Sequence, residues 1–328
     1  MNKRPIGDSG IEVAPLALGG NVFDWTADEA TSFAVLDAFV DAGGTMIDTA
    51  DVYSAWVPGH KGGESESLIG RWLKRDPAKR ARVVIATKVG FLDGIIVDGE
   101  YVAMLEPAVI ARACEASLER LGIDTIDLYY QHRDSETVPL PDSLGAFELL
   151  REQGKIRATG LSNFTADRVD EAVSTARSCG FMPPVALQPW YNMVERERFE
   201  GELREAAIRN SLGVFPYYSL ANGFLTGKYR TAADLGKSPR GSRSAAYLEG
   251  RGRRVLETLD AIAAETGAAL ATISLAWLMA QPAVTAPIAS ATSVAQLSEL
   301  TAAMDLTLTL DQIARLDAAS AEMESAAA

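Results

Sequence analysis

Short apolar runs alternate with longer segments of helical periodicity along almost the whole chain. Val83-Val84-Ile85-Ala86 is apolar at every position, as expected of a parallel strand that is buried on both faces. Between Asp28 and Ala42, by contrast, apolar residues recur three and four positions apart, and Gly43-Gly44 gives a typical helix stop. Repeated in order, these two patterns predict an α/β protein built on a parallel sheet.

The number of repeats selects the architecture. After a predicted β-hairpin over residues 6–13, with its turn at Asp8-Ser9-Gly10, we count eight strands, each followed by a helix. No Pro-, Ser- or Gly-rich linker separates two halves and no GxGxxG motif is present. A single (β/α)8 TIM barrel over residues 1–328, capped by the hairpin and carrying extra C-terminal helices, therefore explains the pattern better than two Rossmann-like domains.

The expected elements can be bounded approximately from the same patterns. Two longer interruptions, Val89–Glu106 and Leu225–Arg251, follow strand ends and could cover the mouth of a site or lie on the surface. Ser320–Ala328 is expected to be a frayed tail. The bounded strands are Thr45–Asp48, Arg82–Lys88, Ile126–His132, Ile156–Leu161, Val185–Gln188, Gly213–Tyr217 and Ala283–Ala289. The helices are Asp28–Ala42, Glu64–Arg75, Pro107–Leu121, Pro141–Gln153, Thr165–Cys179, Phe199–Asn210, Gly252–Thr266, Leu270–Ala280 and Ser293–Ala303.

Four chemically active side chains fall at or just after the ends of these strands. Asp48, Lys88 and His132 each close an apolar run, and Tyr53 lies in the loop that follows Asp48. Parallel strands that are joined by helices all point the same way, so their carboxyl ends form one rim, where enzymes of this architecture place their chemistry. We therefore expect the four side chains to meet at one place.

Such a group could perform acid-base chemistry. A tyrosine that donates a proton near neutral pH needs a pKa below its ordinary value of about 10, and the ammonium of Lys88 would lower it. Asp48, on the neighbouring strand, would keep Lys88 charged, and His132 could hydrogen-bond a substrate oxygen. The group would then protonate a carbonyl oxygen while something else attacks the carbon. Spacing alone leaves a plain Asp–Lys salt bridge and a packed tyrosine as the alternative.

Composition excludes several other classes. At 48% hydrophobic and 23% charged residues the chain is ordinary globular material, and its net charge of -13 argues against nucleic acid or an anionic membrane as a partner. Two cysteines, Cys114 and Cys179, and two histidines, without CxxC or HExxH spacing, predict neither a disulfide framework nor a metal site. With no apolar leader and no span of about 18 apolar residues, we expect a cytoplasmic protein.

Several motifs resemble the signature blocks of the aldo-keto reductases. They are Asp48-Thr49-Ala50-Asp51-Val52-Tyr53, Ala86-Thr87-Lys88-Val89-Gly90, and Leu121-Gly122-Ile123-Asp124 continuing through Asp127-Leu128-Tyr129-Tyr130-Gln131-His132. Gly160-Leu161-Ser162-Asn163-Phe164 and Gly223-Phe224-Leu225-Thr226-Gly227-Lys228-Tyr229 match as well, in the same order. The resemblance covers essentially the whole chain and points to the branch of potassium-channel β subunits and bacterial aryl-alcohol and sugar carbonyl reductases.

The resemblance implies a role for each rim residue. Tyr53 would be the general acid, Asp48 and Lys88 would tune it, and His132 would orient the carbonyl. The reaction implied is the reversible reduction of an aldehyde or ketone, with the hydride supplied by a nicotinamide because none of these side chains can deliver one. The alternative is a nucleotide-sensing regulatory subunit of the channel type with little turnover.

The resemblance also implies where the cofactor binds. Ser162, Asn163 and Gln188 would hold the carboxamide of the nicotinamide, and Tyr217 would stack on its ring. The stretch Gly223–Lys228, with its backbone amides and one ammonium, would hold the pyrophosphate. The remaining implied cofactor contacts are Gly20, Asn21, Ser219, Leu220, Gly223, Leu225, Gly227, Lys228, Arg243, Ser290, Thr292, Ser293 and Gln296.

One departure from the family pattern concerns the adenosine end. Many relatives carry an Arg or Lys in the turn that corresponds to residues 289–296 here, to pair with the 2′-phosphate, but this chain has neither. Charge-assisted hydrogen bonds are about twice as strong as neutral ones, so discrimination for NADP over NAD should be weakened unless Arg240 or Arg243 replaces that charge. The resemblance favours NADP(H) and leaves NAD(H) possible.

Aromatic residues are expected to edge the substrate pocket. Phe23 and Trp25 follow the first hairpin, and Trp56 follows Tyr53. Aromatic rings at a rim favour an apolar or planar carbonyl compound, or a sugar stacked on an indole. The sequence leaves the small-molecule substrate, the favoured direction and the oligomeric state, monomer or homo-oligomer, undecided.

Overall fold

The computed structural model of this chain describes residues 2–92, 95–97, 100–102, 104–238 and 240–322. Its centre is an eight-stranded parallel sheet in the spatial order β11-β10-β9-β8-β5-β4-β3-β12. The sheet closes on itself, because Val214 in β11 forms a parallel bridge with Val284 and the amide of Ile288 in β12 donates to the carbonyl of Pro216 at 2.8 Å. The prediction of a (β/α)8 barrel is confirmed.

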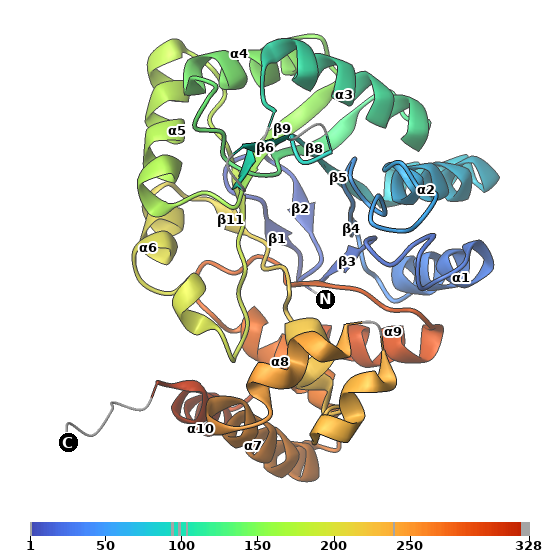
Figure 1. The fold of residues 1–328 in the computed structure, drawn as a ribbon, viewed down its shortest axis with the longest axis vertical. Helices are drawn as coiled ribbons and strands as arrows, with labels where there is room; N and C mark the ends of the chain where they lie inside the picture. Colours follow the sequence, from blue (N-terminus) through green and yellow to red (C-terminus); the bar gives the residue numbers. More distant parts are fainter. Residues whose placement is uncertain (1, 93–94, 98–99, 103, 239, 323–328) are drawn as a thin grey trace.

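Helices surround the sheet, as Figure 1 shows. The strands of the barrel are β3 (Ala17–Gly19), β4 (Met46–Asp48), β5 (Val84–Val89), β8 (Ile126–Gln131), β9 (Ile156–Ser162), β10 (Ala186–Gln188), β11 (Gly213–Val214) and β12 (Ile288–Ala289). The helices are α1 (Glu29–Asp41), α2 (Glu64–Arg75), α3 (Pro107–Leu121), α4 (Leu140–Glu152), α5 (Ala166–Cys179), α6 (Glu202–Arg209), α7 (Gly250–Thr266), α8 (Leu270–Met279), α9 (Val294–Thr301) and α10 (Leu310–Ser320).

Local signals in the sequence account for many of the helix ends. The side chain of Asp28 caps the start of α1 by accepting from the amide of Thr31, and Thr165 caps α5 in the same way through Arg168. Pro107 occupies the first turn of α3, and Gly122 ends that helix in the left-handed conformation with φ +63°. These caps fix where each helix returns the chain to the barrel.

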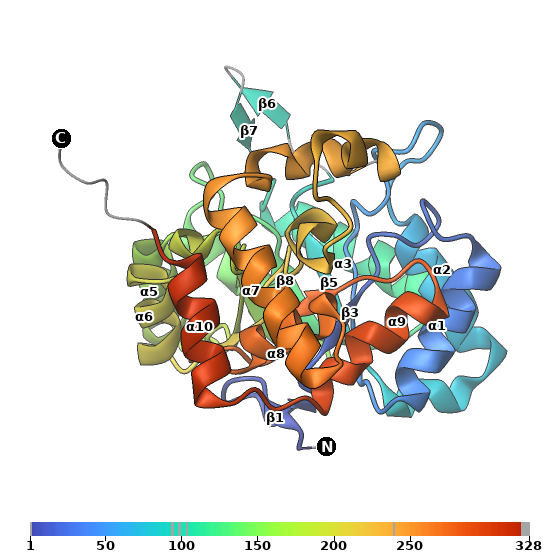
Figure 2. The same ribbon diagram turned by 90° about the horizontal axis from the view of Figure 1, so that it is seen from below.

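An antiparallel hairpin of β1 (Arg4–Pro5) and β2 (Glu12–Val13) closes the amino end of the barrel. Its apolar residues Ile6, Ile11 and Val13 are buried in one cluster with residues such as Leu128 and Phe215. In Figure 2 this hairpin lies at the end of the barrel opposite the small hairpin β6–β7. The hairpin thus fills the amino end of the barrel interior, and the carboxyl ends of the strands stay open for a site.

The structure corrects several predicted bounds. The strands predicted from the sequence do not include β3, the first strand of the barrel. The first strand of the hairpin is Arg4–Pro5, which lies two residues before the predicted start of the hairpin at residue 6. β11 and β12 are shorter than predicted because each predicted run contains a proline, Pro216 or Pro287, which has no backbone N–H for the ladder. α10 is an added helix whose last residue, Ser320, is 1% exposed rather than frayed. Residues 323–328 lie outside the described part of the chain.

Two segments extend from the carboxyl end of the barrel. The first contains β6 (Ile95–Val97) paired with β7 (Glu100–Val102). The second contains three 3-10 helices, Ala221–Thr226, Ala232–Lys237 and Gly241–Tyr247. Within the described residues no single helix is long and apolar enough to cross a membrane, although the bent pair α7 and α8 together would meet the length and composition required.

Candidate active site

The ends of neighbouring strands bring the four predicted residues together. Asp48 is the last residue of β4, Lys88 lies one residue before the end of β5, and His132 follows β8 directly. The register pairs Asp48 with Ala86 and Lys88 with Tyr130, which places these ends side by side. Tyr53 reaches the same point from the loop after β4. The predicted convergence on one rim is what the structure contains.

Lys88 contacts two of the other three rim residues. Its side chain is 0% exposed, and its ammonium donates to Asp48 Oδ2 at 2.7 Å, to the carbonyl oxygen of Thr49 at 2.7 Å and to the hydroxyl of Tyr53 at 3.2 Å. These three contacts use all three donors of the ammonium. Lys88 is therefore held in one orientation, with its charge directed at both a carboxylate and a phenol.

Asp48 has a second partner on its other oxygen. Gln188, the last residue of β10, donates from Nε2 to Asp48 Oδ1 at 2.8 Å. Asp48 and Gln188 are each 2% exposed. Burial raises the pKa of Asp48, while Lys88 and Gln188 act in the opposite direction. Burial also acts to lower the pKa of Lys88, but Asp48 and Tyr53 more than offset this, so the net direction is upward and Lys88 remains protonated.

The pKa of Tyr53 moves in the opposite direction from the one expected. Burial raises it above its ordinary value and outweighs the ammonium of Lys88, which acts to lower it. The expectation of an acidified phenol was wrong for the protein without ligands, because desolvation of a phenolate costs more than one nearby charge returns. A raised pKa keeps Tyr53 protonated at neutral pH, which is the form that can donate a proton.

His132 is neutral at physiological pH. Burial, and then the positive charge of Lys88, lower the pKa of His132 well below its ordinary value. Its ring lies 6.1 Å from that of Tyr53 and 5.1 Å from that of Phe91, measured between centroids. Its Nδ1 is buried and has no hydrogen-bond partner within the described chain. A neutral imidazole in this place can hydrogen-bond an oxygen but is a poor source of protons.

The residues expected to hold a nicotinamide carboxamide also lie together. Asn163, in a left-handed conformation with φ +58°, donates from Nδ2 to the carbonyl of His132 at 2.8 Å and accepts from the hydroxyl of Tyr217 at 2.6 Å. Ser162 donates to the carbonyl of Gln188 at 2.9 Å. Tyr217, Asn163 and Gln188 thus lie beside the four rim residues on one side and present amide and aromatic surfaces there.

The expected phosphate-binding stretch forms a small cradle. Asn222 and Gly223 have φ of +57° and +91°, and Gly227 has φ +78°, so the chain turns tightly here, with the amides of Gly223 and Gly227 donating to the carbonyls of Leu220 and Phe224. The Oδ1 of Asn222 is buried without a hydrogen-bond partner within the described chain. A Cβ on Gly223 would lie 2.8 Å from Nζ of the exposed Lys228, so glycine leaves room beside this ammonium. The ammonium of Lys228 is the group here that fits an anion such as a pyrophosphate.

Other predicted cofactor residues are placed as follows. Ser219 and the side chain of Leu225 are buried, so only their backbones can contribute on this face. Ser290 donates to Oδ1 of Asn21 at 2.7 Å, which ties the turn after β12 to the loop after β3. Gln296 accepts from the amide of Thr292 at 2.9 Å, and Ser293 caps α9. The amide of Gly20 donates to the carbonyl of Asp48 at 2.7 Å, next to Asn21. Leu220 directly precedes the 3-10 helix Ala221–Thr226.

Two arginines approach the mouth from the segment between β11 and α7. Arg243 donates to the hydroxyl of Tyr218 at 3.2 Å, and the guanidinium of Arg240 lies 4.9 Å from the ring of Trp25. Burial lowers the pKa of Arg240. Both positive charges therefore lie on the segment that the sequence predicted as a possible cover, and this segment contacts the rim.

Two of the three expected substrate residues lie at the mouth. Trp56 is 46% exposed, and its ring lies 5.5 Å from that of Trp25 and 5.8 Å from that of Tyr53. Phe23 is 0% exposed and packs in the core between sheet and helices. The expectation that Phe23 edges the pocket was wrong, because the chain turns inward at this residue before Trp25 returns to the surface.

The sequence assigned no role to four residues at or beneath the rim, two of them aromatic and two polar. Phe91 packs on His132, and Tyr218, with φ +55°, lies 4.4 Å from Trp190 and 5.2 Å from Tyr217. Ser65 and Glu66 in α2 are each 0% exposed despite being polar. The available signal was position: Ser65 stands on the same helical face as Leu68, Ile69 and Trp72, where a polar residue needs a partner.

A concave region at the opposite end of the barrel has a different character. It has a volume of about 1510 Å³ and is lined by the starts of strands and by α2 and α3. Its buried carboxylate, Asp127, already pairs with Arg80 and Arg157, each at 2.8 Å. None of the four rim residues lines it. In the described residues no group of three or more His, Cys, Asp or Glu side chains is arranged to hold a metal.

Fold and site together define a parallel barrel in which an aspartate, a lysine, a tyrosine and a histidine lie at the carboxyl rim. The model of the aldo/keto reductase family matches residues 15–321. The chain is 35% identical over 311 residues to the uncharacterized oxidoreductase YrpG of Bacillus subtilis, covering 94% of this chain and 92% of the relative. It therefore belongs to the aldo/keto reductase family, a family of oxidoreductases.

Two further relatives widen the comparison. The aldo-keto reductase yakc of Schizosaccharomyces pombe, named for NADP(+), is 34% identical over 263 residues, covering 78% of this chain and 72% of the relative. A probable voltage-gated potassium channel subunit beta of Oryza sativa subsp. japonica is 30% identical over 316 residues, covering 93% and 92%. The resemblance drawn from the motifs is confirmed at the level of the family.

Proposed function

We propose that this protein is an NAD(P)H-dependent carbonyl reductase that converts an aldehyde or ketone to an alcohol and can run in reverse. The observation that carries the proposal is the contact of one buried ammonium, Lys88 Nζ, with both Asp48 Oδ2 and the hydroxyl of Tyr53 at an accessible rim. This is the arrangement that a tyrosine needs to lose a proton to a substrate oxygen and regain it from solvent.

The side chains around this contact fit a dinucleotide. Ser162, Asn163, Gln188 and Tyr217 would hold the nicotinamide, the cradle from Leu220 to Lys228 would hold the phosphates, and the turn from Ser290 to Gln296 with Asn21 would hold the adenosine. The ammonium of exposed Lys228, which lies in the room left by Gly223, supports this assignment for the phosphates. When bound, the nicotinamide would supply or accept the hydride.

The protein's own residues would handle the oxygen and its proton. A carbonyl oxygen near Tyr53 and neutral His132 would accept hydrogen bonds from both. As negative charge develops on that oxygen, Tyr53 would transfer its proton, and the ammonium of Lys88, 3.2 Å away, would stabilise the phenolate that remains. Asp48, held by Gln188, would keep Lys88 charged throughout. In the oxidation direction the phenolate would take the proton back.

The cofactor and the substrate class rest on different observations. NADP(H) is favoured because a relative with 34% identity is named for NADP(+) and because Arg240 and Arg243 bring positive charge to the mouth; NAD(H) stays possible because residues 289–296 hold no cation. The adjacent indoles of Trp25 and Trp56 favour a small carbonyl compound with an apolar, planar or sugar-like face. A cytoplasmic location stays a prediction of the sequence.

The second candidate is a nucleotide-sensing subunit. It is favoured by the match to a channel β subunit over 93% of this chain. The complete Asp48–Lys88–Tyr53 contact weighs against it, because a sensor has no need of a proton donor. Co-purification with a stoichiometric membrane partner, together with negligible turnover of any carbonyl compound, would favour this candidate over the reductase.

Replacing Tyr53 tests the proposal directly. We expect Tyr53→Phe to reduce kcat for carbonyl reduction by about 10²- to 10⁴-fold, the usual contribution of general acid catalysis, with NADPH binding retained. Turnover over a panel of aldehydes and ketones and quenching of protein fluorescence by NADPH measure the two effects. Tyr191→Phe, which removes a hydroxyl bound to Glu200 at 2.7 Å, is the control and should retain turnover. Full turnover in Tyr53→Phe would refute the mechanism.

A further inference from the structure

The first turn of α2 touches the loop that carries Tyr53. The amide of Gly63, the residue before α2, donates to the carbonyl of Tyr53 at 2.9 Å, and the amide of Ser65 lies 3.4 Å from the same oxygen. The first amides of a helix have no partner within the helix, so they are available for such contacts. The backbone of Tyr53 is therefore bound to the start of α2.

The side chain of Ser65 binds the segment next to Asp48. Its hydroxyl is buried, accepts from Thr49 Oγ1 at 2.8 Å and donates to the carbonyl of Gly20 at 2.9 Å. Thr49 follows Asp48, and its carbonyl is one of the three acceptors around Lys88 Nζ. One serine thus joins the ends of β3 and β4 beneath the catalytic group.

Glu66 reaches the strand that carries Lys88. Its carboxylate accepts from Thr87 Oγ1 at 2.5 Å and from Arg120 Nε, in α3, at 2.7 Å. Successive side chains of a strand point to opposite faces, so Thr87 faces α2 while Lys88 faces the site. Glu66 therefore holds β5 from outside the barrel at the residue before the catalytic lysine.

This buried ion pair is built into the packing of α2 and α3. Glu66 is 0% exposed, and a buried carboxylate is tolerated only when it is paired and hydrogen-bonded. A Cβ on Gly63 would lie 2.4 Å from Cδ of Arg120, and a Cβ on Gly70 would lie 2.2 Å from the carbonyl of Arg120. Both glycines leave the space that Arg120 needs to reach Glu66.

We infer that Ser65 and Glu66 are positioning residues that set the separation of Tyr53 and Lys88. The first turn of α2 binds the backbone of Tyr53, the residue after Asp48 and the residue before Lys88, so its position fixes three of the four rim residues relative to one another. Neither residue touches the substrate. The inference rests on the proposed function, since it assigns these residues to proton transfer by Tyr53.

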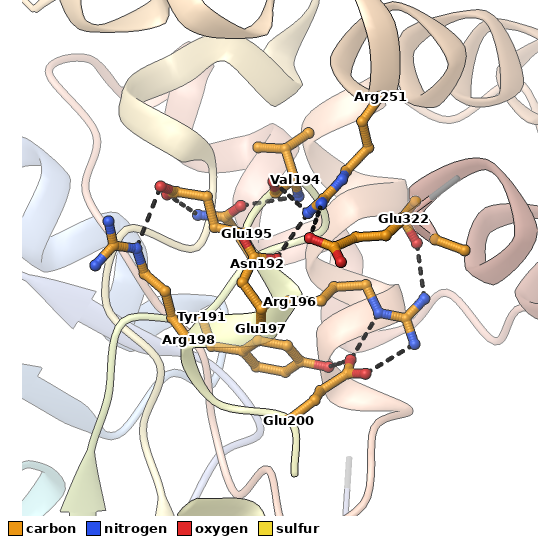
Figure 3. A network of polar contacts seen from close by, with 12 residues as sticks. Tyr191, Asn192, Val194, Glu195, Arg196, Glu197, Arg198, Glu200, Arg251 and Glu322 are labelled. Atoms are coloured by element: carbon orange, nitrogen blue, oxygen red, sulfur yellow. Dashed lines mark hydrogen bonds and ion pairs between the residues drawn. The ribbon is translucent and has the colours of Figure 1, made fainter. Parts of the chain in front are cut away.

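Removal of the Thr87 hydroxyl can distinguish a positioning role of Glu66 from a contribution to stability alone. Thr87→Val keeps the shape of the side chain but removes the donor to Glu66, and Thr87→Ser restores it. Figure 3 shows a matched control: Tyr191 donates to Glu200, a carboxylate that Arg196 also binds at 2.8 and 2.9 Å, far along the chain from the rim residues. Tyr191→Phe removes one hydroxyl donor from a carboxylate held by an arginine, as Thr87→Val does.

The experiment has two readouts, one of them independent of turnover. We expect Thr87→Val, but not Tyr191→Phe, to lower kcat roughly tenfold or more, because a displacement of about 1 Å at a reacting group can cost about a hundredfold. In the protein without cofactor, the tyrosinate titration assigned to Tyr53 by difference from Tyr53→Phe should move to higher pH, since Lys88 no longer approaches the phenol. Thr87→Ser should reverse both effects.

The outcomes separate the inference from the function on which it rests. If Thr87→Val and Tyr191→Phe lose similar amounts of stability in urea and neither changes kcat or the Tyr53 titration, Glu66 is merely structural and the inference is wrong. If instead Tyr53→Phe itself keeps full turnover, the proposed function fails first. A fall in kcat that Thr87→Ser does not rescue also overturns the inference.

Discussion

Asp48 has no oxygen left for solvent. Lys88 occupies Oδ2 and Gln188 occupies Oδ1, so the carboxylate joins the buried lysine of the rim to a residue expected to bind the nicotinamide carboxamide. A change in the position of Gln188 would therefore change the contact of Lys88 through the side chain of Asp48 alone. In this protein the ionisation of the site depends on which groups remain bound to one buried carboxylate.

Removing that carboxylate should reverse the effect of alkaline pH on stability. In the native protein the pKa of Lys88 is raised, so its stabilising contribution is complete below its ordinary value and is lost as pH rises through the folded-state value. In Asp48→Asn the largest influence that opposes burial is removed and only Tyr53 remains against it, so we expect the pKa of Lys88 to fall below its ordinary value. The folded state then binds fewer protons than the unfolded state, and stability should increase with pH across that window.

Urea unfolding from neutral to alkaline pH measures this difference. Breaking a buried pair should also cost about 3–5 kcal/mol at neutral pH. Asp37→Asn is the control, because Lys79 and Asp37 form a pair whose aspartate side chain is 44% exposed, and its pH dependence should follow that of the native protein. A parallel pH profile for Asp48→Asn would show that Asp48 does not set the charge of Lys88.

Single residues also show what the sequence could predict. The positions of Asp48, Lys88 and His132 could be predicted because the carboxyl ends of all parallel barrel strands lie on the same rim. The burial of Phe23, the bond from Gln188 to Asp48 and the direction of the Tyr53 pKa could not, because each depends on packing between segments far apart in sequence. Glu66 looks like any charged residue of an amphipathic helix until Thr87 and Arg120 are seen around it.

Among the elements, α2 and α3 approach so closely that a helix glycine is required. Gly70 lies within α2, where alanine usually stabilises a helix by about 1 kcal/mol relative to glycine. Here a Cβ would lie 2.2 Å from the carbonyl of Arg120, a backbone atom that cannot move without shifting α3. We expect Gly70→Ala to destabilise the protein by about 1–3 kcal/mol, as overpacking does.

Gly145, within α4, provides the opposite expectation. Its Cβ would meet only Phe181, at 3.5 Å, an ordinary contact distance. Gly145→Ala should therefore stabilise the protein by up to about 1 kcal/mol. Denaturation midpoints in urea compare the two variants. Equal effects of the same sign would show that helix propensity, and not the contact between α2 and α3, decides the outcome.

The bounds of helices and strands could be predicted where the run of patterned residues was long, but not where it was short. α3 and α5 were bounded almost correctly because Pro107, Gly122, Thr165 and Gly180 act as local caps. β3 has only three residues, between Pro15 and Gly20, and gives too little pattern to detect. Pro216 follows β11 and Pro287 precedes β12, and their carbonyls accept from the amides of Ile288 and Ala17, so the barrel still closes.

Taken as a whole, the molecule joins both ends of its chain at the expected cofactor site. β12 pairs with β3, and Ser290 donates to Asn21 across 269 positions of sequence. A dinucleotide bound there contacts only the folded protein, so it should raise the melting temperature with increasing concentration. The gain is about 2.7 kcal/mol when the cofactor is present at about 100 times its Kd.

Comparison of the two cofactors tests the role of the arginines. We expect NADPH to raise Tm more than NADH at equal concentration, and Arg243→Ala to reduce the NADPH effect while leaving that of NADH nearly unchanged, since only NADPH carries the 2′-phosphate. Arg253→Ala, an exposed arginine paired with Glu257, is the control and should change neither. Stabilisation by NADH with none by NADPH would refute the preference for NADP(H).

The hairpin of β1 and β2 that fills the amino end of the barrel also decides how the protein could be attached to a solid support. Asp8 in its turn is exposed, and Figure 2 shows the hairpin at the end of the barrel opposite β6–β7, so a linker there would leave the mouth facing solution. The native thiols complicate such coupling unequally. Burial raises the pKa of Cys114 to about 12, which keeps it unreactive, whereas Cys179 is exposed and would have to be replaced first.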